Sequence, residues 1–168
     1  MVILGIDPGT ATTGYGVIET TGASIHAIAF DLIETDKNHS PEKRLHAIYK
    51  KMLDLLAVYK PDVMAIEKVF FAANAKTAIR VGQAQGVMLL AAADALVPVV
   101  EYAPGTIKKV VSGDGRADKK MMQQCVRKFL GAKVRSKVRG KTHFDNAADA
   151  LAVALCHSHH DILHLEIL

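Results

Sequence analysis

Two short apolar runs, far apart in the chain, each end directly on a carboxylate. Val2–Ile6 runs into Asp7, and Val63–Ile66 runs into Glu67. Short apolar runs bounded by turn residues predict buried β-strands, and the Pro-Gly that follows Asp7 supplies such a turn. Strand ends in an open α/β sheet face a cleft. A fold that places these two strands side by side therefore brings two carboxylates together.

The pattern along the rest of the chain predicts an α/β fold, with a five-stranded mixed sheet flanked by helices. The first three strands follow one another through Gly-rich connections, which favours an antiparallel meander. The expected strands are Val2–Ile6, Gly14–Ile18, Ser24–Glu34, Val63–Ile66 and Pro98–Tyr102. The expected helices are Pro41–Tyr59, about Asn74–Leu96, about Gly105–Val111, about Ala117–Leu130 and about Phe144–Ser158.

Composition limits the broad class of protein. The chain has 168 residues, 50% apolar and 23% charged, which is ordinary for one globular domain, so we expect a single domain over residues 1–168. Cys125 and Cys156 are too few and too far apart for a disulfide framework or a CxxC metal site. No signal-peptide pattern opens the chain. The most apolar stretch, Gly86–Val100, is shorter than the ~20 residues of a membrane span, so we expect a buried segment and a cytoplasmic protein with no membrane partner.

A cluster at the end of the chain superficially resembles a zinc tract. It comprises Cys156–His160 together with His164. Structural zinc sites usually combine paired Cys and His ligands at short spacings, and no second Cys pair is present. We therefore expect an exposed helix end here rather than a metal site.

Charge is distributed unevenly. The formal net charge is +4, yet Pro104–Lys141 carries +10 and the remainder −6. This asymmetry points to a polyanionic partner, with a lysine-rich solvated face as the alternative. Within the basic segment, Ala132–Lys141 alternates basic with apolar or small residues, which suits a salt-sensitive arm on a DNA backbone. The basic candidates for DNA contact are Lys108, Lys109, Arg116, Lys120, Arg135, Lys137 and Arg139.

The last predicted helix offers further oxygen ligands. Asp149 shares a helix face with Asn146, three residues earlier, or with Asp145, four earlier. Carboxylate and amide oxygens suit Mg²⁺ or Mn²⁺ rather than zinc. A divalent cation would also relieve the repulsion between Asp7 and Glu67. Each acid alone is more often structural, but together with the basic segment they favour a metal-dependent nuclease.

Five motifs resemble those of the RuvC-type Holliday-junction resolvases, in the same order and spacing from about Met1 to His157. They are Ile3–Gly9 with Thr13–Val17, Ile66–Phe70, Asn74-Ala75, Gly82–Gly86 and Ala147–Ala152. The resemblance implies a ribonuclease-H-like fold and a homodimer built on the long helix after Asn74. It implies paired, symmetric Mg²⁺-dependent incisions in two strands of a four-way DNA junction. It also implies work beside the bacterial branch-migration motor and its junction-binding subunit.

The resemblance also suggests ligands for two metal ions. Two-metal sites hold their ions ~3.5–4 Å apart and stabilise the attacking and leaving oxygens together. We expect Asp7 to bridge two Mg²⁺ ions, with Mn²⁺ as a substitute. Glu67 and Asp149 would each hold one ion, and Asn146 or Asp145 would complete the set.

Further side chains are expected to act on the DNA. Lys108 and Lys119 match basic residues that the family uses near the scissile phosphate, and Lys119 is counted as catalytic. Phe70 and Phe71 follow the catalytic Glu67, where an aromatic ring can stack on an unstacked base for ~1–3 kcal/mol. Packing of both rings in the core is the alternative, and Phe70 is the one we expect to be functional.

One position departs from the family pattern. The third metal-binding side chain of the family is Asp, in some members His, three residues before the last Asp, and this chain has Asn146 there. Asp145 takes the role, or Asn146 is a natural weaker ligand, or the chain is an inactivated variant; these interpretations stay open. A non-cleaving junction-binding protein is therefore an alternative. An ATP-binding protein of the actin and sugar-kinase type is another, because its phosphate loop also reads Asp-x-Gly-Thr, although 168 residues leave no room for two lobes.

Overall fold

The computed structural model describes residues 1–168 except 23, 70–74, 132–140 and 166–168, and leaves the side chains of 141–145 and 160–165 undescribed. Its strands are β1 (Val2–Asp7), β2 (Thr12–Thr21), β3 (Ser24–Glu34), β4 (Val63–Glu67) and β5 (Val99–Tyr102). They form one sheet in the order β3-β2-β1-β4-β5. β1, β2 and β3 pair antiparallel, whereas β4 pairs parallel with both β1 and β5. The predicted mixed five-stranded sheet is confirmed.

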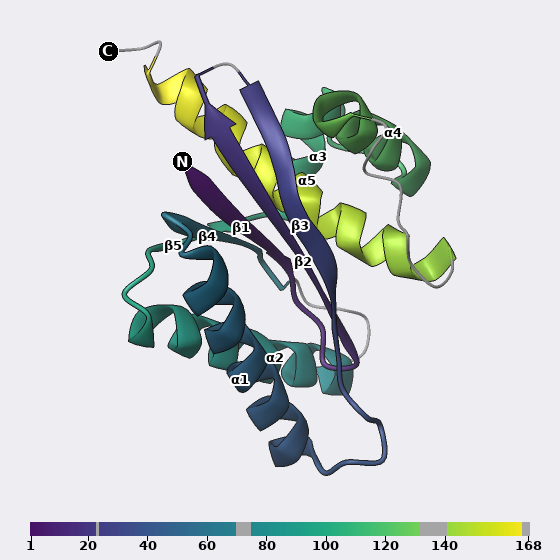
Figure 1. Ribbon diagram of the computed structural model, residues 1–168. Helices are drawn as coiled ribbons and strands as arrows, with labels where there is room; N and C mark the ends of the chain where they lie inside the picture. Colours follow the sequence, from purple (N-terminus) through teal and green to yellow (C-terminus); the bar gives the residue numbers. More distant parts are fainter. Residues whose placement is uncertain (23, 70–74, 132–140, 166–168) are drawn as a thin grey trace.

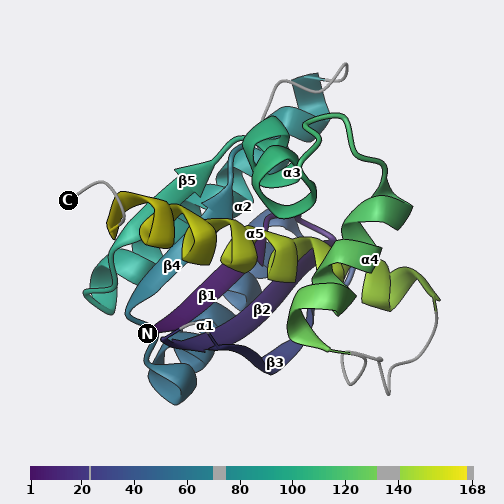
Figure 2. The same cartoon turned by 90° about the horizontal axis from the view of Figure 1, so that it is seen from above.

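Helices cover both faces of the sheet (Figures 1 and 2). They are α1 (Pro41–Tyr59), α2 (Ala75–Asp94), α3 (Pro104–Ser112), α4 (Lys119–Leu130) and α5 (Lys141–Leu165). α1 and α2 lie on one face, and α5 crosses the other face with α3 and α4 beside it (Figure 2). Among the described residues, no helix is long and apolar enough to cross a membrane.

β1 divides the core in two because its side chains alternate between the faces of the sheet. Ile3 packs in a cluster with α3, α4 and α5, whereas Leu4 and Ile6 pack in a second cluster with α1 and α2. All three side chains are fully buried. A strand covered on both faces reads as a continuous apolar run, which is why the sequence of β1 shows no alternation.

α5 lies directly on the backbone of β1 and β2. A Cβ at Gly5 would lie 2.2 Å from the carbonyl oxygen of Ala150 and 2.8 Å from the Cβ of Ala154. A Cβ at Gly14 would lie 2.3 Å from the carbonyl oxygen of Asn146. Only glycine permits such contact, so these positions set how closely α5 can bring its side chains to the end of β1.

Two burial expectations are wrong. Gly86–Val100 is only partly buried, since Leu90 is 53% exposed and Leu96 is 90% exposed. α2 is amphipathic, so one of its faces packs on the sheet and the other faces outward. The expected exposed helix end is also wrong, because Cys156, His157 and Ser158 are buried.

α5 therefore runs further than its apolar pattern indicates, from Lys141 to Leu165. The polar side chains near its end are accommodated by hydrogen bonds. The Nδ1 of His157 lies 2.7 Å from the hydroxyl of Tyr102, and the Ser158 hydroxyl donates to the carbonyl of Leu155 at 2.8 Å. Buried polar groups are stable when they are paired in this way.

Candidate active site

Parallel pairing of β1 with β4 brings Asp7 and Glu67 to the same edge of the sheet. Ile6 is in register with Ile66, and each is followed directly by its acid. The juxtaposition expected from the two apolar runs is therefore present. Both acids are partly exposed, at the point where the strands leave the core.

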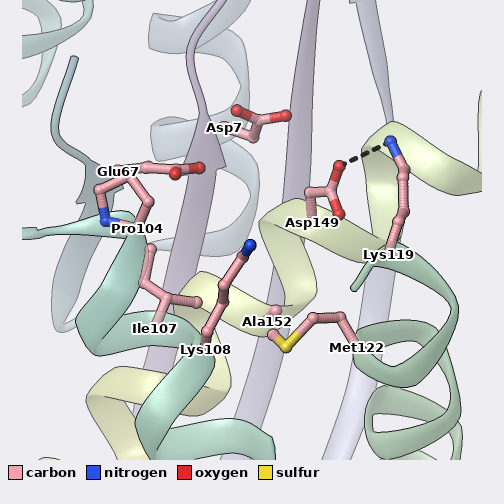
Figure 3. Close-up of a pocket in the computed structure, with 9 residues that line it drawn as sticks. All are labelled: Asp7, Glu67, Pro104, Ile107, Lys108, Lys119, Met122, Asp149 and Ala152. Carbon is pink, nitrogen blue, oxygen red and sulfur yellow. Dashed lines mark ion pairs between the residues drawn. The ribbon is translucent and has the colours of Figure 1, made fainter. Parts of the chain in front are cut away.

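α3, α4 and α5 close this edge into a cavity of about 250 Å³. Its lining residues are Asp7, Glu67, Pro104, Ile107, Lys108, Lys119, Met122, Asp149 and Ala152. Figure 3 shows the carboxyl groups of Asp7, Glu67 and Asp149 around the same space, with Lys108 and Lys119 reaching in from α3 and α4. Five separate elements thus contribute to one site.

One ion pair crosses the cavity. The Nζ of Lys119 lies 3.0 Å from an Oδ of Asp149, as the dashed line in Figure 3 marks. Lys119 is the first residue of α4, whose N-cap Asp118 accepts a hydrogen bond from the Met121 amide. A side-chain cap of this kind fixes where a helix begins. It therefore also fixes the point from which the Lys119 side chain extends.

Burial and neighbouring charges raise the pKa values of Asp7 and Glu67. Burial raises the pKa of Asp7 to about 7, with further increases from the charges of Glu67 and Asp149, while Lys119 opposes the shift. Burial and the charge of Asp149 also raise the pKa of Glu67, and Lys108 lowers it. Bringing three carboxylates into one half-buried space costs free energy that cations can offset.

The donor set fits a hard divalent cation, because it consists of carboxylate oxygens. Among the described side chains, however, no group of three or more His, Cys, Asp or Glu is placed so that it could hold one ion. Asp149 is paired with Lys119 instead. The site thus has the chemistry of a magnesium centre, with a lysine ammonium beside one of the acids.

Comparison with known proteins gives the family. The family model described as "Crossover junction endodeoxyribonuclease RuvC" matches residues 3–157. The chain is 46% identical over 158 residues to the protein of that name from Moorella thermoacetica, covering 94% of this chain and 91% of the relative. It is 47% identical over 156 residues to that of Thermotoga maritima, covering 93% and 89%. The chain belongs to the RuvC family.

A solved structure supports the same assignment. RuvC of T. thermophilus in complex with a Holliday junction substrate superposes with a TM-score of 0.86 at 31% identity, covering 98% of this chain and 96% of that one. The fold of this RuvC-family chain is thus the ribonuclease-H-like fold that the motifs imply.

Several predicted site residues do not line the cavity or are not described. Asn146 lies on α5 with its carbonyl oxygen against Gly14 and is not among the lining residues. The side chain of Asp145 is undescribed, so the structure does not choose between the two as a ligand. Also outside the described residues are Phe70, Phe71, Arg135, Lys137 and Arg139.

The structure places Lys108 and Lys119 differently from the lysines next to them. Lys108 and Lys119 line the cavity, whereas Lys109 and Lys120 do not. Lys109 donates from its Nζ to the carbonyl of Gly113 at 2.9 Å and so caps the end of α3. Arg116 is exposed and also lies outside the lining.

Sequence analysis missed the apolar wall of the site. Ile107 and Met122 are buried and line the cavity beside the two lysines, with Pro104 and Ala152 completing the wall. Excluding water from one side strengthens the interactions of the charges that remain. The sequence predicted helices over about Gly105–Val111 and about Ala117–Leu130, but not that apolar side chains of both face the acids.

Hydrogen bonds from Thr13 and Arg44 hold the loop that follows Asp7. The Thr13 hydroxyl donates to the carbonyl of Gly9 at 2.7 Å. Arg44 of α1 donates from Nη2 to the carbonyl of Thr10 at 2.8 Å and from Nε to the Thr35 hydroxyl at 2.9 Å. No local motif singles out Arg44, since its partners Thr10 and Thr35 lie 34 and 9 positions away in the chain.

The raised pKa of Asp7 predicts how the stability of the metal-free protein changes with pH. The folded chain holds a proton on Asp7 up to about pH 7, whereas an unfolded Asp releases it near 3.8. The contribution of Asp7 to the free energy of unfolding should therefore fall as pH rises from about 4 to about 7 and change no further above that. Asp7→Asn removes this contribution. The free energy of unfolding of the variant, relative to that of the wild type, should therefore increase by roughly 4 kcal/mol between about pH 4 and about pH 7, at 1.36 kcal/mol per pKa unit.

Urea unfolding in the presence of EDTA at pH values from 4 to 8 measures this difference. A constant difference between the two proteins over the whole range would contradict the raised pKa.

Proposed function

We propose that this chain is an endonuclease that resolves four-way DNA junctions by metal-dependent hydrolysis of phosphodiesters. The observation that carries the proposal is the single cavity in which Asp7, Glu67 and Asp149 meet Lys108 and Lys119. Its walls belong partly to the segment 104–141, which carries a net charge of +10. Acids for a cation and a basic surface for a polyanion thus adjoin.

The relatives support this substrate. They are named crossover junction endodeoxyribonucleases, and the T. thermophilus relative was solved with a Holliday junction substrate. A family match over residues 3–157 leaves the ATP-binding alternative without support. We propose further that residues 1–168 act as one nuclease domain, in the cytoplasm, beside the branch-migration motor and its junction-binding subunit.

We propose that Asp7, Glu67 and Asp149 hold two Mg²⁺ ions, or Mn²⁺ in their place, with Asn146 or Asp145 completing the ligands. When bound, these ions supply positive charge that stabilises the attacking and leaving oxygens of an in-line displacement at phosphorus. Asp7 is suited to serve both ions because the sheet fixes its backbone. Asp7 itself pairs with β2, and the residue before it pairs with β4.

The chain's own side chains position the phosphate. Lys108 and Lys119 extend into the cavity from two helices and attract the scissile phosphodiester, and Ile107 and Met122 limit water there. Lys109, Lys120 and Arg116 are exposed nearby in the sequence and contribute general attraction to the backbone. Phe70, Phe71, Arg135, Lys137 and Arg139 remain predicted DNA contacts.

The outward face of α2 supports the homodimer. Ile79 is 63% exposed and Leu90 is 53% exposed. Between them on the same face, a Cβ at Gly82 or Gly86 would meet no described atom within 4 Å apart from its chain neighbours and the nearby backbone of α2. An apolar face with small residues at its centre lets a second helix approach closely. We propose that a second copy packs here, so that two sites make paired, symmetric incisions.

The cleavage assay uses a four-way junction that can branch-migrate, with Mg²⁺ or Mn²⁺. Asp7→Asn, Glu67→Gln and Asp149→Asn should each lower the cleavage rate on the order of 10²-fold or more, because each removes a charge fixed at the reacting group. Junction affinity should change little. Asn146→Asp should cleave faster than the parent chain, since it adds a charged ligand.

Asp54→Asn is the matched control, because Asp54 is an exposed acid on α1 and lies outside the site. It should cleave at the parent rate. Junction binding without cleavage by the parent chain and by Asn146→Asp would support the non-cleaving binding protein and contradict the nuclease.

The dimer is tested by analytical ultracentrifugation at micromolar concentration. Ile79→Glu and Leu90→Glu should each produce a monomer, because they bury a charge in the apolar interface. Leu96→Glu is the control, since Leu96 is 90% exposed just beyond the end of α2 and should leave the dimer intact. A parent chain that is monomeric, or an Ile79→Glu variant that stays dimeric, would rule out this face.

A further inference from the structure

The pair between Lys119 and Asp149 puts a candidate metal ligand in contact with a cation from the protein itself. Their charged atoms are 3.0 Å apart, within the cavity that also holds Asp7 and Glu67. Figure 3 shows the carboxyl group of Asp149 directed to Lys119, and this is the one ion pair marked among the residues drawn there. The ammonium of Lys119 thus offsets part of the negative charge of Asp149.

A metal ion bound by all three acids would need the carboxylate that Lys119 contacts. As placed, the described acids form no group of three that could hold one ion, although three of them line one cavity. Coordination of an ion by Asp149 together with the other acids therefore requires its carboxylate to leave Lys119 or to share its charge with the metal.

Helix stability does not account for a lysine at this position. Lys119 and Lys120 occupy the first turn of α4, and that turn contains no acid. A cation at a helix N-terminus is opposed by the partial positive charge of the helix dipole. The Lys119 ammonium is instead stabilised by acids across the cavity, by Asp149 in direct contact and by the nearby charge of Asp7.

We propose that Lys119 is an exchangeable cation that occupies Asp149 until a divalent metal ion displaces it. The proposal rests on the metal-dependent function argued above and assigns a second role to Lys119, as a competitor of the metal ion. Displacement also frees the ammonium to contact a phosphate. Binding of the metal ion at Asp149 and binding of a phosphate by Lys119 are therefore linked.

Exposure makes the exchange easy. The side chain of Lys119 is 50% exposed and that of Asp149 is 30% exposed. Ion pairs this open to water favour the paired state by at most about fivefold, or about 1 kcal/mol at 1.4 kcal/mol per tenfold. A lysine is suited to this role because its ammonium is a compact point charge on a flexible stem, whereas an arginine would form a bidentate pair with the carboxylate.

The test measures the affinity of the full-length, DNA-free protein for Mn²⁺, by calorimetry or by the electron spin resonance signal of free Mn²⁺. Lys119→Met should bind Mn²⁺ more tightly than the parent chain, by up to about fivefold. Lys119→Arg should bind no more tightly than the parent. Lys120→Met is the matched control, since it removes the same charge from the next residue of α4, outside the cavity lining, and it should leave the affinity unchanged.

A second measurement follows the lysine directly. In a protein labelled with ¹⁵N-lysine, the ammonium resonance that is missing from Lys119→Arg should shift as Mg²⁺ is added, and the resonance missing from Lys120→Met should not. This readout is independent of DNA cleavage.

The outcomes separate the two proposals. Mn²⁺ binding by the parent chain with unchanged or weaker affinity in Lys119→Met would overturn the exchange and leave the metal-dependent function standing. An equal gain in Lys120→Met would also overturn it, because the effect would then be general electrostatics. Absence of Mn²⁺ binding in the parent chain would overturn both.

Discussion

The cost of burying three mutually repelling carboxylates in one cavity is the constraint on which the rest of this site depends. Asp7, Glu67 and Asp149 come from two strands and a helix. Burial and the charges of Glu67 and Asp149 raise the pKa of Asp7, and burial and the charge of Asp149 raise the pKa of Glu67. Two lysines reduce that cost without removing it. A site of this kind is poised for added positive charge, which is why the structure favours a divalent cation and a phosphodiester together.

The scaffold sets this repulsion by geometry that is difficult to relax. Parallel pairing of β1 and β4 aligns two acids at one edge, and α5 lies on Gly5 and Gly14 with no room for a side chain between. The backbone packing of α5 on the sheet therefore carries Asp149 close to the strand ends. The apolar core on either face of β1 holds this arrangement together.

Local pattern was sufficient to predict the strand ends and the third acid. The apolar runs before Asp7 and Glu67 mark buried strands, and the spacing from Asn146 to Asp149 marks a helix face. The pairing of Lys119 with Asp149 depends instead on where α4 packs, which no local spacing encodes. The same holds for Arg44, and for the burial of His157, whose partner Tyr102 lies 55 residues away in the chain.

The measurement that tests this account most directly is the number of protons released when Mg²⁺ binds. Metal ligation requires a deprotonated carboxylate, and the pKa of Asp7 in the metal-free protein is about 7. Calorimetry in buffers of different ionisation enthalpy should therefore find release of roughly half a proton at pH 7, rising towards pH 6 and vanishing above about pH 8, with none in Asp7→Asn. Proton release that does not change with pH, or that persists in Asp7→Asn, would contradict the claim that the metal ion displaces a proton from Asp7.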